Sequence, residues 1–216
     1  MKTAKKAMLM TLCAIILVVA TVFGTMAYLT STDEVVNTFT VGNVAIKLDE
    51  AKVGTDGKAL TGADATRVKE NSYKLLPGHV YDKDPTVTVL ANSEESYVKM
   101  TVTVNKANEL DAIFAPSGAD LTSIFNGYNS ANWIAKGNTK DATANTRTYE
   151  FWYKEAVGAP TADVALDALF DSITVPGSIT KEQLATIEGL TITVNAYAIQ
   201  ADGFDDADAA WAEFSA

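Results

Sequence analysis

The feature that most constrains the fold is a strict alternation of apolar and polar residues from Tyr97 to Val104. Val98, Met100, Val102 and Val104 fall on one face of an extended chain, and Tyr97, Lys99, Thr101 and Thr103 fall on the other. This period of two is typical of a strand with one face in a core. Comparable strands are predicted at Val44–Leu48, Thr86–Leu90, Arg147–Lys154 and Leu190–Gln200. We therefore expect a mainly β fold, an antiparallel β-sandwich with short inserted helices.

Between these predicted strands, some apolar residues recur at the spacing of a helix. Leu110, Ile113 and Phe114 fit one helical turn and Leu121–Phe125 fit another, while Asn126–Thr146 read as a loop with a short strand at Trp133–Ile134. These turns place a helical insertion around residues 105–188 of a single domain.

Three further helix starts follow from capping residues. Thr161 is predicted to cap a helix that carries Leu166, Leu169, Phe170 and Ile173. Thr180 with Gln183 forms a capping-box pattern, and Asp205 with Asp208 resembles the start of a helix that carries Trp211 and Phe214.

The N-terminus has the pattern of a secretory signal peptide. Lys2, Lys5 and Lys6 precede an uncharged apolar run from Ala7 to Phe23, and Thr25 and Ala27 are small residues at positions −3 and −1 of a cleavage site. We predict that residues 1–27 are removed and that the mature domain, residues 28–216, begins at Tyr28. The alternative is an uncleaved anchor, because Ala7–Ala27 is long enough to cross a hydrocarbon core of about 30 Å.

Charge and cysteine content narrow the function classes. The net charge is −10 and becomes −13 when the three lysines of the signal peptide are lost. Nucleic-acid binding needs a basic surface, so we expect no such partner. The only cysteine, Cys13, lies inside the apolar run, so the mature chain has no thiol for a disulfide or a thiolate metal site. Its stability must come from packing.

Three blocks resemble the TasA/camelysin family of Gram-positive bacteria. They read GTMAYLTSTDEVVNTFTVGNVAIKLDE, LLPGHVYDKDPTVTVLANSEESYVKMTVTV and ITVNAYAIQADGFDDADAAWAEF, and together they cover about a third of the chain. The resemblance implies a jelly-roll-like sandwich, export, and cleavage by a SipW-type signal peptidase. It also implies assembly into fibres of the extracellular biofilm matrix, with the N-terminal segment donated to the next subunit and an accessory matrix protein as a possible partner.

The N-terminal segment itself fits strand donation. Val35, Asn37, Phe39 and Val41 alternate with Val36, Thr38 and Thr40, and no proline interrupts them. Such a segment can complete a neighbour's sheet by β-strand addition, and repeated head-to-tail contacts of this kind give filaments. The alternative is an ordinary first strand paired within its own domain.

Catalytic chemistry has little support in the sequence. The one histidine, His79, lies in a Pro-Gly-His turn, with no G-x-S-x-G elbow for a serine nucleophile and no second histidine for a zinc peptidase. Asp202, Asp205, Asp206 and Asp208 form an acidic group for which helix capping is preferred over calcium binding.

The sequence thus predicts a secreted, non-enzymatic filament subunit of the matrix or cell surface, without cofactor or metal and without membrane contact after cleavage. A camelysin-type metallopeptidase is one alternative. A monomeric adhesion or ligand-binding module is another, with Trp133 and Trp152 in an exposed aromatic patch.

Overall fold

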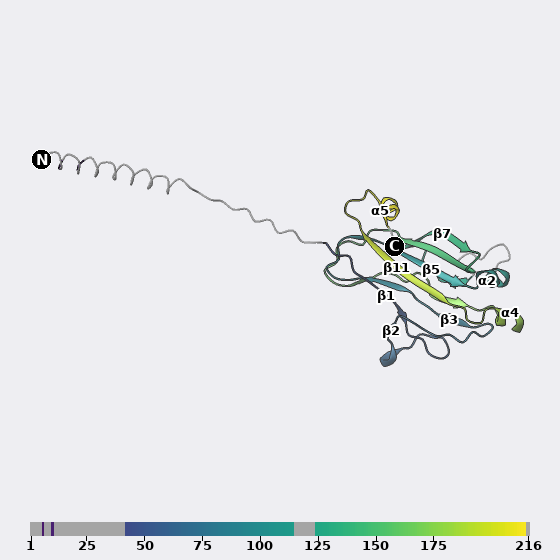
Figure 1. Cartoon of the computed structure of the whole chain (residues 1–216). Helices are drawn as coiled ribbons and strands as arrows, with labels where there is room; N and C mark the ends of the chain where they lie inside the picture. Colours follow the sequence, from purple (N-terminus) through teal and green to yellow (C-terminus); the bar gives the residue numbers. More distant parts are fainter. Residues whose placement is uncertain (1–5, 7–9, 11–41, 115–123, 215–216) are drawn as a thin grey trace. The chain divides into compact units, whose positions relative to one another are not determined.

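The computed structural model describes residues 6, 10, 42–114 and 124–214 of a chain that divides into two units, residues 1–41 and residues 42–216. The described part of the larger unit is mainly β, as predicted: its strand pairs are all antiparallel, in three sheets, and its helices are short (Figure 1). No helix among the described residues is both long and apolar enough to span a bilayer.

The longest sheet has the strand order β11-β5-β8-β7. Its central strands β5 (Ser96–Asn105) and β8 (Thr146–Tyr153) lie between β11 (Ile192–Gln200) and β7 (Trp133–Asp141). The predicted alternation in β5 is confirmed, because Val98, Met100, Val102 and Val104 are at most 1% exposed.

Two smaller sheets complete the unit. One has the order β2-β1-β4-β9, formed by β2 (Arg67–Val68), β1 (Ile46–Ala51), β4 (Thr86–Val89) and β9 (Val164–Ala165). The other has the order β3-β10-β6, formed by β3 (Val80–Asp82), β10 (Ser172–Thr174) and β6 (Phe125–Asn126).

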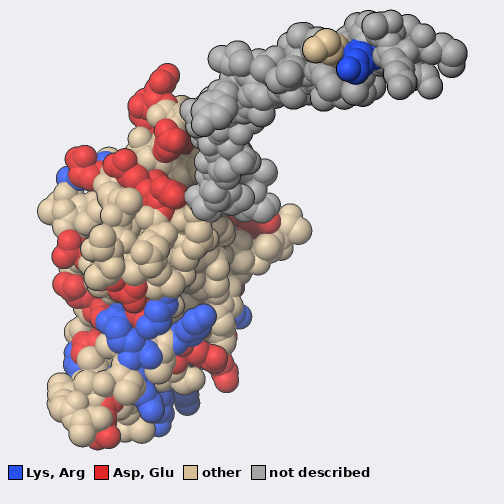
Figure 2. Space-filling model, turned by 90° about the vertical axis from the view of Figure 1, so that its left-hand side faces the viewer, with Lys and Arg blue, Asp and Glu red and all other residues tan. Residues whose placement is uncertain are grey.

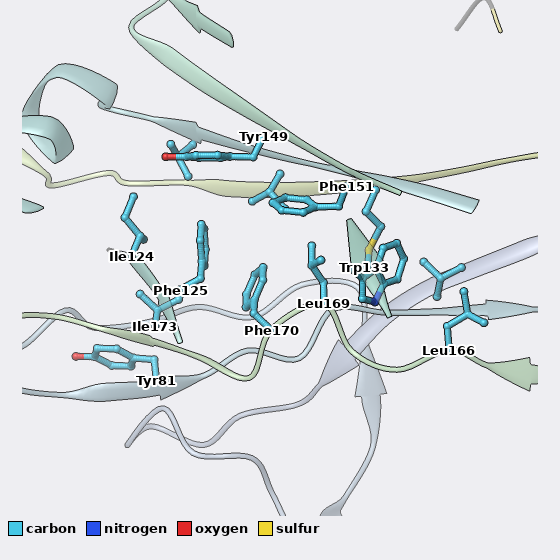
Figure 3. Close-up of a cluster of buried hydrophobic side chains, with 14 of the residues drawn as sticks. Tyr81, Ile124, Phe125, Trp133, Tyr149, Phe151, Leu166, Leu169, Phe170 and Ile173 are labelled. Atoms are coloured by element: carbon cyan, nitrogen blue, oxygen red, sulfur yellow. The ribbon is translucent and has the colours of Figure 1, made fainter. Parts of the chain in front are cut away.

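The side chains of the three sheets meet in one hydrophobic core. Figure 3 shows Tyr149 and Phe151 of β8 on one side, Tyr81 and Ile173 on the other, and Phe125 among the rings between them. Phe125 and Phe170 lie with ring centroids 4.3 Å apart. Residues 42–216 contain no cysteine, so this packing must hold the unit without a disulfide.

Three α-helices and one 3₁₀ turn, η1 (Gly62–Asp64), connect the strands of the described part. The turn predicted at Leu110–Phe114 is confirmed as α2 (Ala107–Phe114), and the capping box of Thr180 and Gln183 is confirmed at the start of α4 (Lys181–Thr186). The C-terminal helix α5 (Ala207–Glu213) also forms, but its cap is Asp206 rather than Asp205, since the Asp206 carboxylate accepts the N–H of Ala209 at 2.9 Å.

The helix predicted after Thr161 is wrong. The segment instead contributes β9 and β10, and its backbone bonds to other strands, as in the bond from the Leu166 N–H to the Val87 carbonyl. The apolar residues of the predicted helical face are nevertheless all core residues: Leu166, Leu169, Phe170 and Ile173. Their spacing reflects burial of an irregular chain, which tertiary packing imposes over local propensity.

The loop predicted at Asn126–Thr146 is confirmed at residues 127–132 and 142–145 but is wrong at residues 135–141, which belong to a strand. β7 (nine residues in all) runs seven residues beyond the expected two, to Asp141, and pairs with β8 through a bulge between Ala135 and Gly137. Every residue of β7 after Trp133 is exposed, so no alternation marks the strand. The described residues between 105 and 188 therefore form α2 and α4 near the two ends of this range and five strands between them.

Candidate functional site

The core is open along β11. Ile192, Val194, Ala196 and Ala198 share the core-facing side of the strand, as predicted, and lie opposite Val104, Val102, Met100 and Val98 of β5. The β5 residues are fully buried, whereas the β11 residues are only half-buried. The reason is the position of β11 at a sheet edge: among the described residues it is hydrogen-bonded to β5 on one side and to no strand on the other.

β1 shows the same drop in burial. Ile46 and Leu48 lie opposite Val89 and Val87 of β4, both 0% exposed, yet are themselves half-buried. β2 pairs with only the last two residues of β1, Glu50 and Ala51, so the stretch from Ile46 to Asp49 has a strand neighbour on one side alone among the described residues.

These two open edges line one groove of about 1330 Å³. Ile46 and Leu48 lie along one wall and Ile192 and Val194 along the other. Helix α4, the segment between α4 and β11, and the segment after β2 add further half-buried apolar side chains: Tyr73, Leu75, Leu184 and Leu190. The volume exceeds the range of about 300–1,000 Å³ typical of small-molecule sites, which favours a chain segment as the occupant.

A buried polar group lies at one end of the groove. Lys83 and Glu50 are each 7% exposed, and Lys83 Nζ lies 2.5 Å from Glu50 Oε2. Asn71 Nδ2 donates to the other carboxylate oxygen, Oε1, at 3.0 Å. Burial raises the pKa of the nearby Tyr73 hydroxyl far above its ordinary value, and the charge of Glu50 raises it further.

A second ionic cluster joins β1 to β2. Arg67 donates from Nε to Asp49 and from Nη1 to Asp84 at 2.8 Å, and Lys47 Nζ lies 2.6 Å from Asp49 Oδ2. Burial acts to raise the pKa of Asp49, but the hydrogen bonds from Lys47 and Arg67 outweigh it and leave the pKa below its ordinary value. This cluster fixes the end of β1 that borders the groove.

The groove differs in charge from the acidic chain as a whole. Its lining includes five lysines, Lys47, Lys69, Lys74, Lys83 and Lys181, and four acids, Asp49, Glu50, Glu70 and Glu188. Figure 2 shows Lys and Arg side chains gathered in the lower half of one face, at the height of β1 and β2 in Figure 1, and mainly Asp and Glu at the height of α5.

The residues predicted for export and donation lie outside the described residues. These are the cleavage residues Thr25, Ala27 and Tyr28 and the donor residues Val35, Asn37, Phe39 and Val41. The groove itself was missed, because alternation assigns residues to a face but does not reveal which strand lies at an edge.

The other candidate residues, His79, the two tryptophans and the acidic group near α5, lie where structural roles account for them. His79 is exposed, as expected for a turn, and no group of three or more His, Cys, Asp or Glu in the described ranges is placed to hold a metal ion. Trp133 is 1% exposed, so it cannot belong to an exposed aromatic patch, and half-buried Trp152 lies under Lys136, whose Nζ is 3.8 Å from its ring centroid. In the acidic group, Asp206 caps α5 and Asp208 pairs with Lys136 at 3.0 Å.

Comparison with protein-family models, curated proteins and solved structures found no match to this chain. The resemblance to the TasA/camelysin family is therefore carried by the three sequence blocks alone.

Proposed function

We propose that this protein is an exported structural subunit that polymerises by donating residues 35–41 of one copy to the groove between β1 and β11 of the next. The observation that carries the proposal is the half-open core, in which Ile46, Leu48, Ile192 and Val194 each lie beside a fully buried partner. An added strand would remove the exposed remainder of these side chains from water. Burial of a fully exposed side chain of this kind is worth about 1.5–3 kcal/mol, so each half-buried one would contribute only part of that.

The donor segment suits the groove in pattern and in charge. Val35, Asn37, Phe39 and Val41 form one face of an extended segment, and three of these four side chains are apolar. Asp33 and Glu34 immediately precede it, and the groove lining carries more lysines than acids. A second copy of this chain is therefore the occupant to which the proposal commits.

In the proposed pathway the chain is exported, cut after Ala27 by a SipW-type signal peptidase, and folded into a jelly-roll-like sandwich that the donated strand completes. The product is a filament of the extracellular matrix or cell surface, with an accessory matrix protein as a further candidate partner. The proposal assigns the protein no enzymatic activity.

Substitution in the groove tests the acceptor side. Val194→Lys places a charge on the half-buried face, whereas Asn195→Lys places the same charge on the exposed face of the same strand. We expect the first variant to form no filaments and the second to form them like the unsubstituted protein, as seen by electron microscopy.

Mixing separates a blocked groove from a misfolded chain. A folded Val194→Lys subunit still donates its own segment, so a small fraction of it should shorten filaments of the unsubstituted protein. Filaments of normal length containing Val194→Lys at every position would refute the groove as the acceptor.

A further inference from the structure

The buried side chains of Lys83 and Glu50 form a polar group with half-buried Asn71, and the filament proposal assigns this group no role of its own. One carboxylate holds the other two side chains, since Glu50 Oε2 accepts from the Lys83 amine at 2.5 Å and Oε1 accepts from the Asn71 amide at 3.0 Å. An isolated buried ion pair is a poor stabiliser, because desolvation offsets the Coulomb attraction. The arrangement therefore calls for a role beyond packing.

The backbone fixes the orientation of the Asn71 amide. Its Oδ1 accepts the N–H of Val53 at 3.0 Å, and its Nδ2 donates to the carbonyl of Ala51 at 2.8 Å. The amide oxygen thus already has a donor where negative charge would develop during attack on Cγ. The amide nitrogen faces Glu50, a group able to protonate it as it leaves.

We propose that these three residues are a self-modifying site that joins Lys83 Nζ to Asn71 Cγ in an intramolecular isopeptide bond. Lys83 is the nucleophile, Asn71 is the acyl donor, and Glu50 moves the protons. Amines desolvated in apolar surroundings are effective nucleophiles once neutral. The inference does not depend on filament formation.

The step balances without a co-reactant. Lys83 passes a proton to Glu50, and the freed electron pair on Nζ forms the Nζ–Cγ bond while the Val53 N–H stabilises charge on Oδ1. The Cγ–Nδ2 bond breaks with its electron pair on nitrogen, and Glu50 relays protons from Nζ to the leaving group. Nitrogen departs as ammonium, Glu50 ends as a carboxylate, and nothing is oxidised or reduced.

The bond would be a covalent cross-link in a mature chain that has no cysteine and so cannot form a disulfide. It would close the segment between Asn71 and Lys83, which contains the turn at Pro77 and Gly78 and strand β3. Closing such a loop restricts the unfolded chain in the same way as a disulfide.

Mass spectrometry of protein purified from cells that express the whole chain tests this directly. The bond removes one ammonia, about 17 Da, from the intact mass. It also blocks trypsin at Lys83, so the peptide of residues 70–74 should appear joined to the peptide of residues 75–99. Separate peptides of residues 70–74 and 75–83 at their unmodified masses would overturn the proposal.

Two variants test the assignment: Lys83→Arg separates the bond from other causes of the mass loss, and Glu50→Gln tests the proton relay. Lys83→Arg keeps the positive charge but cannot form the bond, so it should lose the joined peptide. Cyclisation of Asn71 with its own backbone also releases ammonia, but it would survive in Lys83→Arg and leave the two peptides separate. In Glu50→Gln the proton relay is lost, and we expect the joined peptide to fall at least tenfold; an undiminished yield would refute the role of Glu50.

Discussion

Asp49 is 4% exposed and is held by Lys47 and Arg67, so its charge should make stability depend on pH. Its folded pKa lies below the ordinary value of 3.8. The contribution is therefore complete above that value and is lost as the pH falls through the lower, folded pKa. A hydrogen bond to a charged group is worth about 1.5–3 kcal/mol.

We predict that Asp49→Asn lowers the free energy of unfolding by about 1.5–3 kcal/mol at pH 7 and that the difference from the unsubstituted protein shrinks below pH 3.8. Urea unfolding at a series of pH values measures it. Asp64→Asn, a change at an exposed acid of η1, is the matched control. A difference that stays constant down to pH 2 would contradict this account.

The burial of Lys83 could have been predicted from sequence. Tyr81, Lys83, Pro85, Val87 and Val89 alternate with half-buried residues, and all five are buried. The period of two thus continues through the break between β3 and β4 and places Lys83 on the inner face. Its partners could not have been predicted, because Glu50 and Asn71 come from distant parts of the chain.

At the scale of elements, α4 forms part of the groove wall and depends on its capping box. Thr180 accepts the N–H of Gln183 at 3.2 Å, and the Gln183 side chain accepts the N–H of Thr180 at 2.9 Å. We predict that Thr180→Ala lowers the free energy of unfolding by about 1 kcal/mol, the usual contribution of an N-cap side chain. For a domain of this size the melting temperature should fall by roughly 2–4 °C.

Thr180→Ser is the control for this prediction, because serine retains the capping oxygen. Thermal unfolding followed by circular dichroism distinguishes the two variants. Equal melting temperatures for Thr180→Ala and the unsubstituted protein would show that the cap is not needed.

The elements that the sequence predicted well are those with one buried face. Apolar and polar residues alternate strictly in β5 because the core covers one of its faces. The start of α4 can be recognised from a local motif, the capping box of Thr180 and Gln183. β7 gives no such signal, since after Trp133 both its faces are exposed at a sheet edge. The segment after Thr161 was wrongly predicted as a helix because its buried residues lie at helical spacing although the chain there is mostly irregular.

At the scale of the whole molecule, the groove between β1 and β11 links the fold to the proposed assembly. Sequence patterns identified the apolar faces of both strands and the donor-like segment at Val35–Val41. Which strands lie at open edges is a property of topology, so the groove that we propose as the acceptor is visible only in the folded chain.

The most direct test of strand donation is electron microscopy of the protein beginning at Tyr28 beside a version beginning at Gly42. The first contains the donor segment and the groove, whereas the second keeps the groove and lacks the segment. We predict filaments from the first and monomers from the second. If the protein beginning at Tyr28 stays monomeric at high concentration, or if the version beginning at Gly42 forms the same filaments, assembly by donation of this segment is contradicted.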